Sequence, residues 1–228
     1  MRAPGRLGAM ARTPRKLLAG YCYHVINRGN RRETVFHTPG DYRAFLGIVA
    51  QAQSERPVPM LAACLMPNHF HFVLKPAEIG DMSRWFHWVM TTHVARYHRA
   101  HGTSGRLWQG PYKPFPIQEE PYLLSVMRYV EANALRAGLV GRAEDWRWGS
   151  LSWRLRGRLP QGFIDPPSGL PEQWTEQVNT LDRPGDLEKL RTSVNRQRPY
   201  GSREWARETA RRMGLQSSMR TVGRPRRS

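Results

Sequence analysis

The stretch MPNHFHFVL, residues 66–74, sets the centre of the fold. Pro67-Asn68 is a pair of turn-forming residues, with apolar runs on either side of it at Met60–Met66 and His69–Lys75. Two apolar runs of strand length around a two-residue turn predict a tight β-hairpin.

The second of these runs contains the pair His69 and His71. Side chains two positions apart in a strand share one face and lie roughly 7 Å apart along it, whereas Phe70 lies on the other face. Two imidazoles placed in this way can bind one divalent metal ion. A lone His-x-His pair is a weak signal, because such pairs also occur as structural or surface residues. An apolar strand would not bury two ionisable rings without partners, which favours a site.

Further elements lie on both sides of the hairpin. A strand is predicted at Tyr21–Asn27, a helix from the N-cap Thr38 to Pro57, a second helix from an N-cap at Asp81 to Gly102, and a short strand at Tyr112–Gln118. The order predicts an α+β fold, namely a ferredoxin-like split βαββαβ antiparallel sheet with both helices on one face. The opposite face of the sheet is left for a ligand or another helix.

A third helix is predicted from Glu119-Glu120-Pro121 to Ala137, with Gly138 just beyond its end. Tyr129 and Asn133 are four residues apart on it, so they point the same way. If this helix face packs against the histidine strand, the Tyr129 hydroxyl can reach a phosphate that is bound to the metal. Asn133 can then supply a third ligand to the metal. Alternatively, Tyr129 lies on the rim of the helix and Asn133 only helps to end it.

The charge of the chain predicts a polyanionic partner. Thirty-six Lys and Arg against 18 Asp and Glu give a net charge of +18, which is typical of nucleic-acid-binding proteins, although ribosomal and membrane-surface proteins share it. No run of apolar residues reaches the roughly 18 needed for a membrane span, so no membrane partner is expected. Cys22 and Cys64 lie in apolar runs, which predicts buried thiols and a reducing compartment. We therefore expect a cytoplasmic, nucleoid-associated protein.

Basic and aromatic residues at three places are candidate nucleic-acid contacts. They are Arg28, Asn30, Arg31 and Arg32 in a turn after the first strand, Trp108, Tyr112 and Lys113 around the start of the fourth strand, and Arg224, Arg226 and Arg227 in the C-terminal GRPRR sequence. The first group suits phosphate, the rings suit stacking on unpaired bases, and the last group suits a narrow minor groove. A solvated tail would have the same composition as that last group.

The composition and the predicted elements divide the chain into four parts. Residues 1–16 form a basic N-terminal tail, in which Met10 is an alternative start, and residues 17–155 form the catalytic domain. Residues 156–200 are rich in Pro, Gly and Arg and are expected to form an extended wrap. Residues 201–228 are expected to hold a short helix and a basic tail.

Four segments in order resemble motifs of the REP-associated tyrosine transposases, a branch of the single-tyrosine HUH transposases. They are YHVINRGNRRE (23–33), MPNHFHFVL (66–74), LWQGPYK (107–113) and RYVEANALRAGLV (128–140). The resemblance covers about residues 10–155. The chain departs from the family pattern at Pro111, where an arginine is usual, and at Ala134, where a proline is usual. The first departure removes a phosphate contact, and neither removes a catalytic group.

The resemblance implies that Tyr129 is the nucleophile, that His69 and His71 bind the metal, and that Asn133 occupies the position of the family's third polar ligand. It also implies a palindromic, REP-like hairpin of single-stranded DNA as substrate and a 5′-phosphotyrosine intermediate. The ligand types do not distinguish Mg²⁺ from Mn²⁺, and the sequence does not distinguish a monomer from a homodimer. Two other functions stay open, namely a non-catalytic binder of single-stranded DNA or RNA and a metal-dependent nuclease that uses water.

Overall fold

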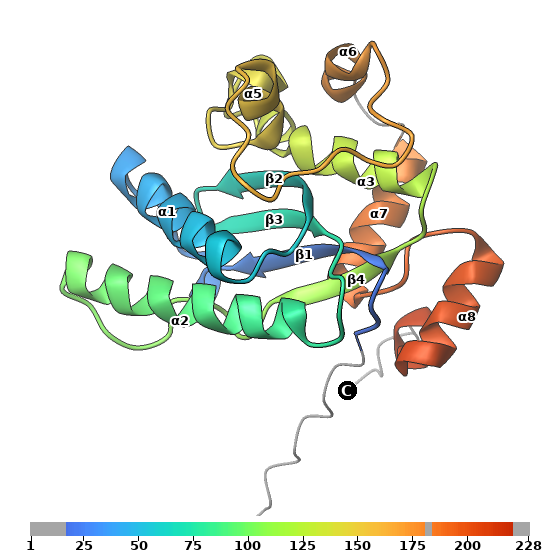
Figure 1. Cartoon of the computed structure of the whole chain (residues 1–228), viewed down its shortest axis with the longest axis horizontal. Helices are drawn as coiled ribbons and strands as arrows, with labels where there is room; N and C mark the ends of the chain where they lie inside the picture. Colours follow the sequence, from blue (N-terminus) through green and yellow to red (C-terminus); the bar gives the residue numbers. More distant parts are fainter. Residues whose placement is uncertain (1–16, 181–183, 221–228) are drawn as a thin grey trace, which may run out of the picture.

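A four-stranded antiparallel sheet with helices on both faces forms the protein (Figure 1). The computed structural model describes residues 17–180 and 184–220. The strands are β1 (Cys22–Arg28), β2 (Met60–Met66), β3 (His69–Leu74) and β4 (Lys113–Ile117), in the order β2-β3-β1-β4. With α1 (Pro39–Glu55) and α2 (Asp81–His101) in the two crossovers, this is the predicted split βαββαβ sheet. The α+β fold class is confirmed.

The predicted hairpin is the β2–β3 pair. Met66 pairs with His69, and Cys64 pairs with His71. Paired residues of antiparallel strands share a face, so both histidines lie on the Cys64 face and Phe70 lies on the opposite one. The alternation that the sequence suggests is therefore present in the sheet.

Helices α1 and α2 cover the face that carries Phe70 (Figure 1). The core there is largely aromatic, with Phe45, Phe72, Trp85 and Phe86 all buried. Helix α1 begins with the expected Thr38 N-cap, completed by Asp41 into a capping box. The N-cap of α2 is Gly80 rather than Asp81, because Gly80 takes a left-handed conformation (φ 95°) that glycine tolerates best.

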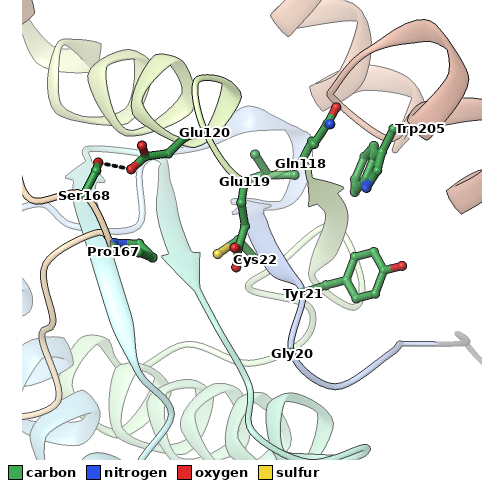
Figure 2. A pocket seen from close by; sticks show the side chains of 10 residues that line it. Gly20, Tyr21, Cys22, Gln118, Glu119, Glu120, Pro167, Ser168 and Trp205 are labelled. Atoms are coloured by element: carbon green, nitrogen blue, oxygen red, sulfur yellow. Dashed lines mark hydrogen bonds between the residues drawn. The ribbon is translucent and has the colours of Figure 1, made fainter.

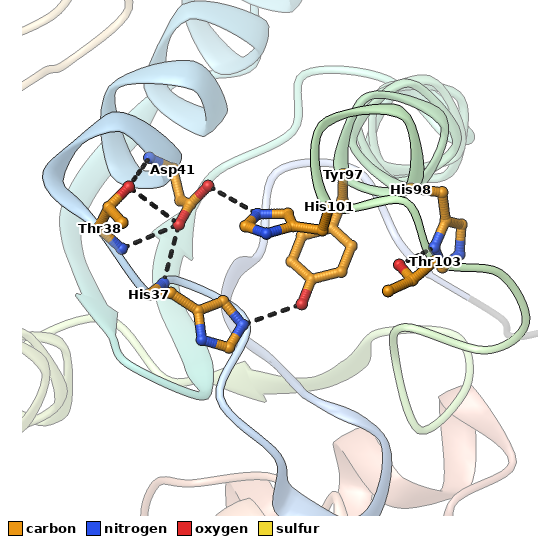
Figure 3. A network of polar contacts seen from close by, with 7 residues as sticks. All are labelled: His37, Thr38, Asp41, Tyr97, His98, His101 and Thr103. Carbon is orange, nitrogen blue, oxygen red and sulfur yellow. Dashed lines mark hydrogen bonds and ion pairs between the residues drawn. The ribbon is translucent and has the colours of Figure 1, made fainter.

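A polar network joins the start of α1 to the end of α2 (Figure 3). The Asp41 carboxylate pairs with His101 Nε2 at 3.0 Å and accepts a hydrogen bond from the backbone N–H of His37. His37 Nε2 lies 2.9 Å from the Tyr97 hydroxyl. These contacts link the two helices at this end of the outer layer.

The other face of the sheet is covered by α3 (Tyr122–Glu131), α4 (Asn133–Arg136) and the elements that follow them (Figure 1). Leu123, Val126, Met127 and Val130 of α3 are fully buried. The single helix predicted to run to Ala137 is instead divided at Ala132, whose ψ of 3° departs from the helical value. Tyr129 and Asn133 therefore lie on either side of a break.

Residues 156–200 do not form the extended wrap that their Pro, Gly and Arg content predicts. After α5 (Ser150–Leu155) this segment holds α6 (Trp174–Asn179) and α7 (Pro184–Arg196). Trp174, Val178 and Leu190 are buried in the second core. Sparse but well-spaced apolar residues are enough to dock these helices.

The C-terminal helix is where the sequence places it. Helix α8 (Arg203–Met213) is capped by Ser202 and ends at Gly214, which has a φ of 69°. Three 3₁₀ helices complete the fold, η1 (Asn30–Arg32), η2 (Ala143–Asp145) and η3 (Gln216–Met219). The predictions for residues 1–16 and for Arg224, Arg226 and Arg227 lie outside the described residues.

Both cysteines are buried free thiols, as predicted. Burial raises the pKa of Cys22 and of Cys64 to about 12, so neither is a reactive thiolate. None of the helices in the described ranges is long and apolar enough to span a membrane.

Candidate metal and nucleophile site

Three histidines lie together on the sheet face that meets α3. His69 and His71 project from β3, and His24 projects from the neighbouring β1. His24 is fully buried and His71 is 2% exposed, whereas His69 is half-buried. The cluster is thus open to solvent at its His69 end, and a substrate would approach from there.

Asn68, the second residue of the hairpin turn, sets the orientation of His69. Its Nδ2 donates to the backbone carbonyl of Arg32 at 2.9 Å, and its Oδ1 lies 2.6 Å from His69 Nδ1. Because an amide oxygen only accepts, His69 carries its proton on Nδ1. The Nε2 of His69 then has a free lone pair, which is the state that a metal ligand needs.

The partner of His71 is another imidazole, that of His24. His24 Nε2 lies 2.7 Å from His71 Nδ1, and the two rings are tilted with centroids 4.9 Å apart. Burial lowers the pKa of His24 to about 3, and burial together with the nearby cations holds the pKa of His71 well below its usual value. Burial also lowers the pKa of His69 to about 4, with Arg28 adding to the effect. All three rings are therefore neutral at pH 7.

Tyr129 packs directly against this cluster from α3. Its ring stands edge-on to His71, with centroids 5.9 Å apart, and edge-on to His24 at 6.2 Å. The Arg136 guanidinium lies over the Tyr129 ring, 4.3 Å from its centroid, and donates to the backbone carbonyl of Tyr129. The tyrosine is 7% exposed. The structure thus brings Tyr129 and His71 together, although 58 positions separate them in the sequence.

Asn133 contacts the end of the tyrosine helix. Its Nδ2 donates to the backbone carbonyl of Tyr129 at 3.0 Å. Asn133 thus makes the helix-ending contact that is the alternative to metal binding. Since a carbonyl only accepts, the amide nitrogen faces the backbone, and Oδ1 is the atom that remains to act as a ligand.

Two basic strand residues lie on the same sheet face as the histidines, and further basic residues lie in the turn beyond β1. Arg28 pairs with His69 across the sheet, and Lys113 pairs with Ile26, which places both on the histidine face by strand alternation. Asn30, Arg31 and Arg32 form η1 just beyond β1, where both arginines are exposed. Asn68 holds this turn next to His69 through its bond to Arg32.

Trp108 and Tyr112 are not brought to this site. They are 5% and 7% exposed and belong to the core on the opposite face of the sheet. Trp108 packs edge-on against Phe70, and Tyr112 stacks on Phe86. Both also line a pocket of about 1080 Å³ on that face, and their contact with bases stays a prediction. Both rings complete an aromatic core.

A divalent cation at this cluster would be held by His69 and His71 together with Asn133. Within the described residues, no three His, Cys, Asp or Glu side chains are grouped so as to hold a metal. A site here therefore depends on two imidazoles and an amide oxygen. Neutral imidazoles with a fixed Nδ1 partner, as at His69, are suited to first-row metals.

Two functional candidates were missed by the reading of the sequence. His24 is buried in β1 and is the hydrogen-bond partner of His71. Arg136 of α4 covers the Tyr129 ring. A histidine in a buried strand beside a His-x-His strand was the signal available for the first. Arg136 falls seven positions after Tyr129, which is the same helical face.

A separate cavity lies at the opposite end of β1, next to Tyr21 and Trp205 (Figure 2). Its volume is about 810 Å³, and Glu119 and Glu120 line it. Carboxylates repel phosphate, so this cavity is a poor match for nucleic acid.

A family model described as "Transposase IS200 like" matches residues 18–133, just over half of the chain. The chain belongs to the IS200-like transposase family. The matched stretch runs through β1, the hairpin and α3 as far as Asn133, so it includes the histidine cluster and Tyr129. No curated protein matches the sequence.

Two solved structures resemble this IS200-like transposase. One is a REP-associated tyrosine transposase bound to a REP hairpin, at 19% identity and a TM-score of 0.52, covering 72% of this chain and 98% of that one. The other is a candidate transposase from Deinococcus radiodurans R1, at 16% identity and a TM-score of 0.38, covering 53% of this chain and 96% of that one. At this identity, the first match shows a shared fold, which agrees with the family resemblance in the sequence. The second is too distant to support an argument.

Proposed function

We propose that this IS200-like transposase cuts and rejoins single-stranded DNA through a covalent bond to Tyr129. In this proposal His69, His71 and Asn133 hold a Mg²⁺ or Mn²⁺ ion. The observation that carries it is the contact between the Tyr129 ring and His71, at 5.9 Å between centroids. A nucleophile from a helix and a metal-ligand pair from a strand meet at one place, which is what this chemistry requires.

The nucleophile needs help, because a tyrosine with a pKa near 10 is protonated at neutral pH. The Arg136 guanidinium lies over the Tyr129 ring and places a positive charge beside the nucleophile. The phenolate oxygen attacks phosphorus, and the bond to the 3′-oxygen breaks. The 3′-oxygen takes up a proton, and Tyr129 loses its own to solvent. The products are a 5′-phosphotyrosyl link and a free 3′-OH.

Rejoining needs no external energy source. The phosphotyrosyl bond retains the energy of the phosphodiester, so a second 3′-OH can displace Tyr129 and reverse the step. A divalent cation at this site would polarise the phosphate and neutralise charge in the in-line transition state. Asn68 prepares His69 for such a cation by keeping its proton on Nδ1.

The substrate is proposed to be a DNA hairpin with a single-stranded flank. The solved relative was captured with a REP hairpin, and the net charge of +18 suits a polyanion. Arg28 and Lys113 border the histidines on the same face, and Arg31 and Arg32 lie exposed beside them. These side chains offer phosphate contacts next to the histidines.

A non-catalytic single-strand binder of the RNA-recognition type is disfavoured by the layers of the fold. Such proteins stack bases on exposed aromatic residues of the sheet. Here α1 and α2 cover one face and α3 covers the other (Figure 1). The sheet of the described residues thus has no open aromatic platform.

The proposal is tested by incubating the protein with end-labelled hairpin DNA and Mn²⁺ and separating the products on a denaturing gel. We expect a DNA adduct that survives denaturation and is lost in Tyr129→Phe. Tyr122→Phe is the matched control, since Tyr122 lies on the same helix but packs against Tyr200; it should keep the adduct. Cleavage without an adduct would favour the water-dependent nuclease, and binding without cleavage would favour a binding protein.

A further inference from the structure

The pairing of His24 with His71 joins two buried imidazoles that have no charged partner. His24 Nε2 and His71 Nδ1 are 2.7 Å apart, which is a short hydrogen bond between two neutral rings. His24 lies between Phe115, at 4.8 Å between centroids, and the edge of Tyr129. Both rings of the pair are buried, so the position of each proton decides which nitrogen is left as an acceptor.

Only two arrangements of protons satisfy this bond. In the first, His24 donates from Nε2, so the neutral His71 carries its own proton on Nε2 and has no lone pair there. In the second, His71 donates from Nδ1, and its Nε2 is bare. A metal ligand must present an unprotonated nitrogen, so only the second arrangement prepares His71 for a cation.

We propose that His24 is a positioning residue, which accepts a hydrogen bond from His71 Nδ1 and thereby holds His71 ready to bind the metal through Nε2. This inference rests on the proposed function. His24 is not itself a ligand here, since its Nε2 is used by His71 and its Nδ1 is buried.

The remaining nitrogen of His24 supports a functional role. His24 Nδ1 is buried and has no hydrogen-bond partner among the described residues. A buried polar atom without a partner costs stability, and an apolar side chain would fill the place beside Phe115 without that cost. A purely structural role therefore does not explain a histidine at this position.

In both proposed histidine ligands, the Nδ1 atom faces a hydrogen-bond partner from a neighbouring residue. His69 Nδ1 meets the Oδ1 of Asn68, which can only accept, and His71 Nδ1 meets the Nε2 of His24, which accepts in one of its two tautomers. Both rings are then aligned with Nε2 directed away from the supporting residue. Partners of this kind orient metal-bound histidines and tune metal affinity.

The first test is spectroscopic and needs no substrate. In the metal-free, full-length protein, ¹⁵N NMR of the histidine rings reports which nitrogen carries the proton. We expect His71 as the Nδ1–H form in the wild type and a mixture of forms in His24→Phe. Finding His71 with its proton on Nε2 in the wild type would overturn the proposal.

The second test measures the affinity for Mn²⁺ alone, from the free-ion electron paramagnetic resonance signal. His24→Phe should bind Mn²⁺ about 10 to 100 times more weakly, which is the effect typical of losing such a partner. His24→Gln should restore binding, because its amide oxygen can accept from His71. His93→Phe is the control, since His93 is equally buried but lies on the other face of the sheet.

The outcomes distinguish a failure of the role proposed for His24 from a failure of the proposed function of the protein. Wild-type affinity in His24→Phe, together with lost affinity in His69→Ala, overturns the role of His24 and leaves the metal site intact. No Mn²⁺ binding by the wild type overturns both. Weak binding in both the Phe and Gln variants, with unchanged thermal unfolding, would also contradict the proposal, because the Gln variant keeps the acceptor.

Discussion

The Tyr129 ring meets the imidazole of His71 edge-on, with 5.9 Å between the ring centroids. The tyrosine comes from α3, which covers one face of the sheet, and the histidine comes from a central strand of that sheet. The candidate site thus joins two elements that lie far apart in the sequence. Asn68, Arg136 and Glu131 on this side of the sheet, and His93 on the opposite side, can be tested separately.

Asn68 is expected to support the metal through His69. Asn68→Ala removes the acceptor at His69 Nδ1, so Mn²⁺ affinity should fall about 10- to 100-fold. Asn68→Asp keeps an acceptor at the same place and should bind Mn²⁺ more tightly than the Ala variant. Titration calorimetry measures both. Equal affinity in the wild type and Asn68→Ala would show that His69 does not depend on its neighbour.

Arg136 is expected to act on the rate of DNA cleavage. Arg136→Ala removes the positive charge over the Tyr129 ring, and loss of such stabilisation typically slows reaction by about 100-fold. Arg136→Lys keeps the charge but not the planar guanidinium, so an intermediate rate is expected. Single-turnover cleavage with excess protein measures the rates, and thermal unfolding checks the fold. A wild-type rate in the Ala variant would remove Arg136 from the mechanism.

The order of the strands and helices and the main motifs could be predicted from the sequence, because they depend on local patterns. The turn pair at Pro67-Asn68 and the alternation through Phe70 predicted the hairpin and the histidine face, which the strand pairing confirms. The Thr38 cap was equally local. These features depend on residues within a few positions of one another.

The features that were missed depend on tertiary contacts. The break at Ala132 and the burial of Trp108 are set by packing between segments far apart in the chain. The helices within residues 156–200 form because Trp174 and Leu190 find a core that local composition does not reveal. The partner of His71 lies 47 residues away on another strand, which no spacing rule indicates.

Glu131 is expected to stabilise the tyrosine helix. Its buried carboxylate accepts from Ser150 Oγ at 2.6 Å and from Trp174 Nε1 at 2.7 Å, which ties α3 to α5 and α6. Glu131→Ala leaves two buried donors unpaired, so the free energy of unfolding should fall by about 2–4 kcal/mol. Urea unfolding measures it, with the exposed Glu188→Ala as control. A loss below about 0.5 kcal/mol would show that the carboxylate is not an anchor.

His93 is expected to make the fold sensitive to acid. Burial lowers the pKa of His93 to about 4; Asp41 opposes this effect, and Arg96 and His101 add to it. The unfolded chain, with an ordinary pKa near 6.5, takes up a proton that the native protein excludes. Stability should therefore fall as the pH drops from about 6.5 to 4, by up to about 1.4 kcal/mol per pH unit from this residue.

Replacing His93 tests that dependence. His93→Phe suits an aromatic surrounding of Phe36, Phe45 and Trp108. Its free energy of unfolding, measured in urea at several pH values, should decline less steeply than that of the wild type in this window. Parallel curves for the two proteins would mean that His93 is protonated as easily in the native state as in the unfolded one.

The covalent step itself is tested most directly by mass spectrometry of the DNA adduct. The protein is reacted with hairpin DNA and Mn²⁺, digested with nuclease and protease, and its peptides are sequenced. We predict a nucleotide attached through its 5′-phosphate to the peptide that contains Tyr129, and to that residue within it. A nucleotide on any other residue, or DNA cleavage with unmodified Tyr129 throughout, would contradict the account.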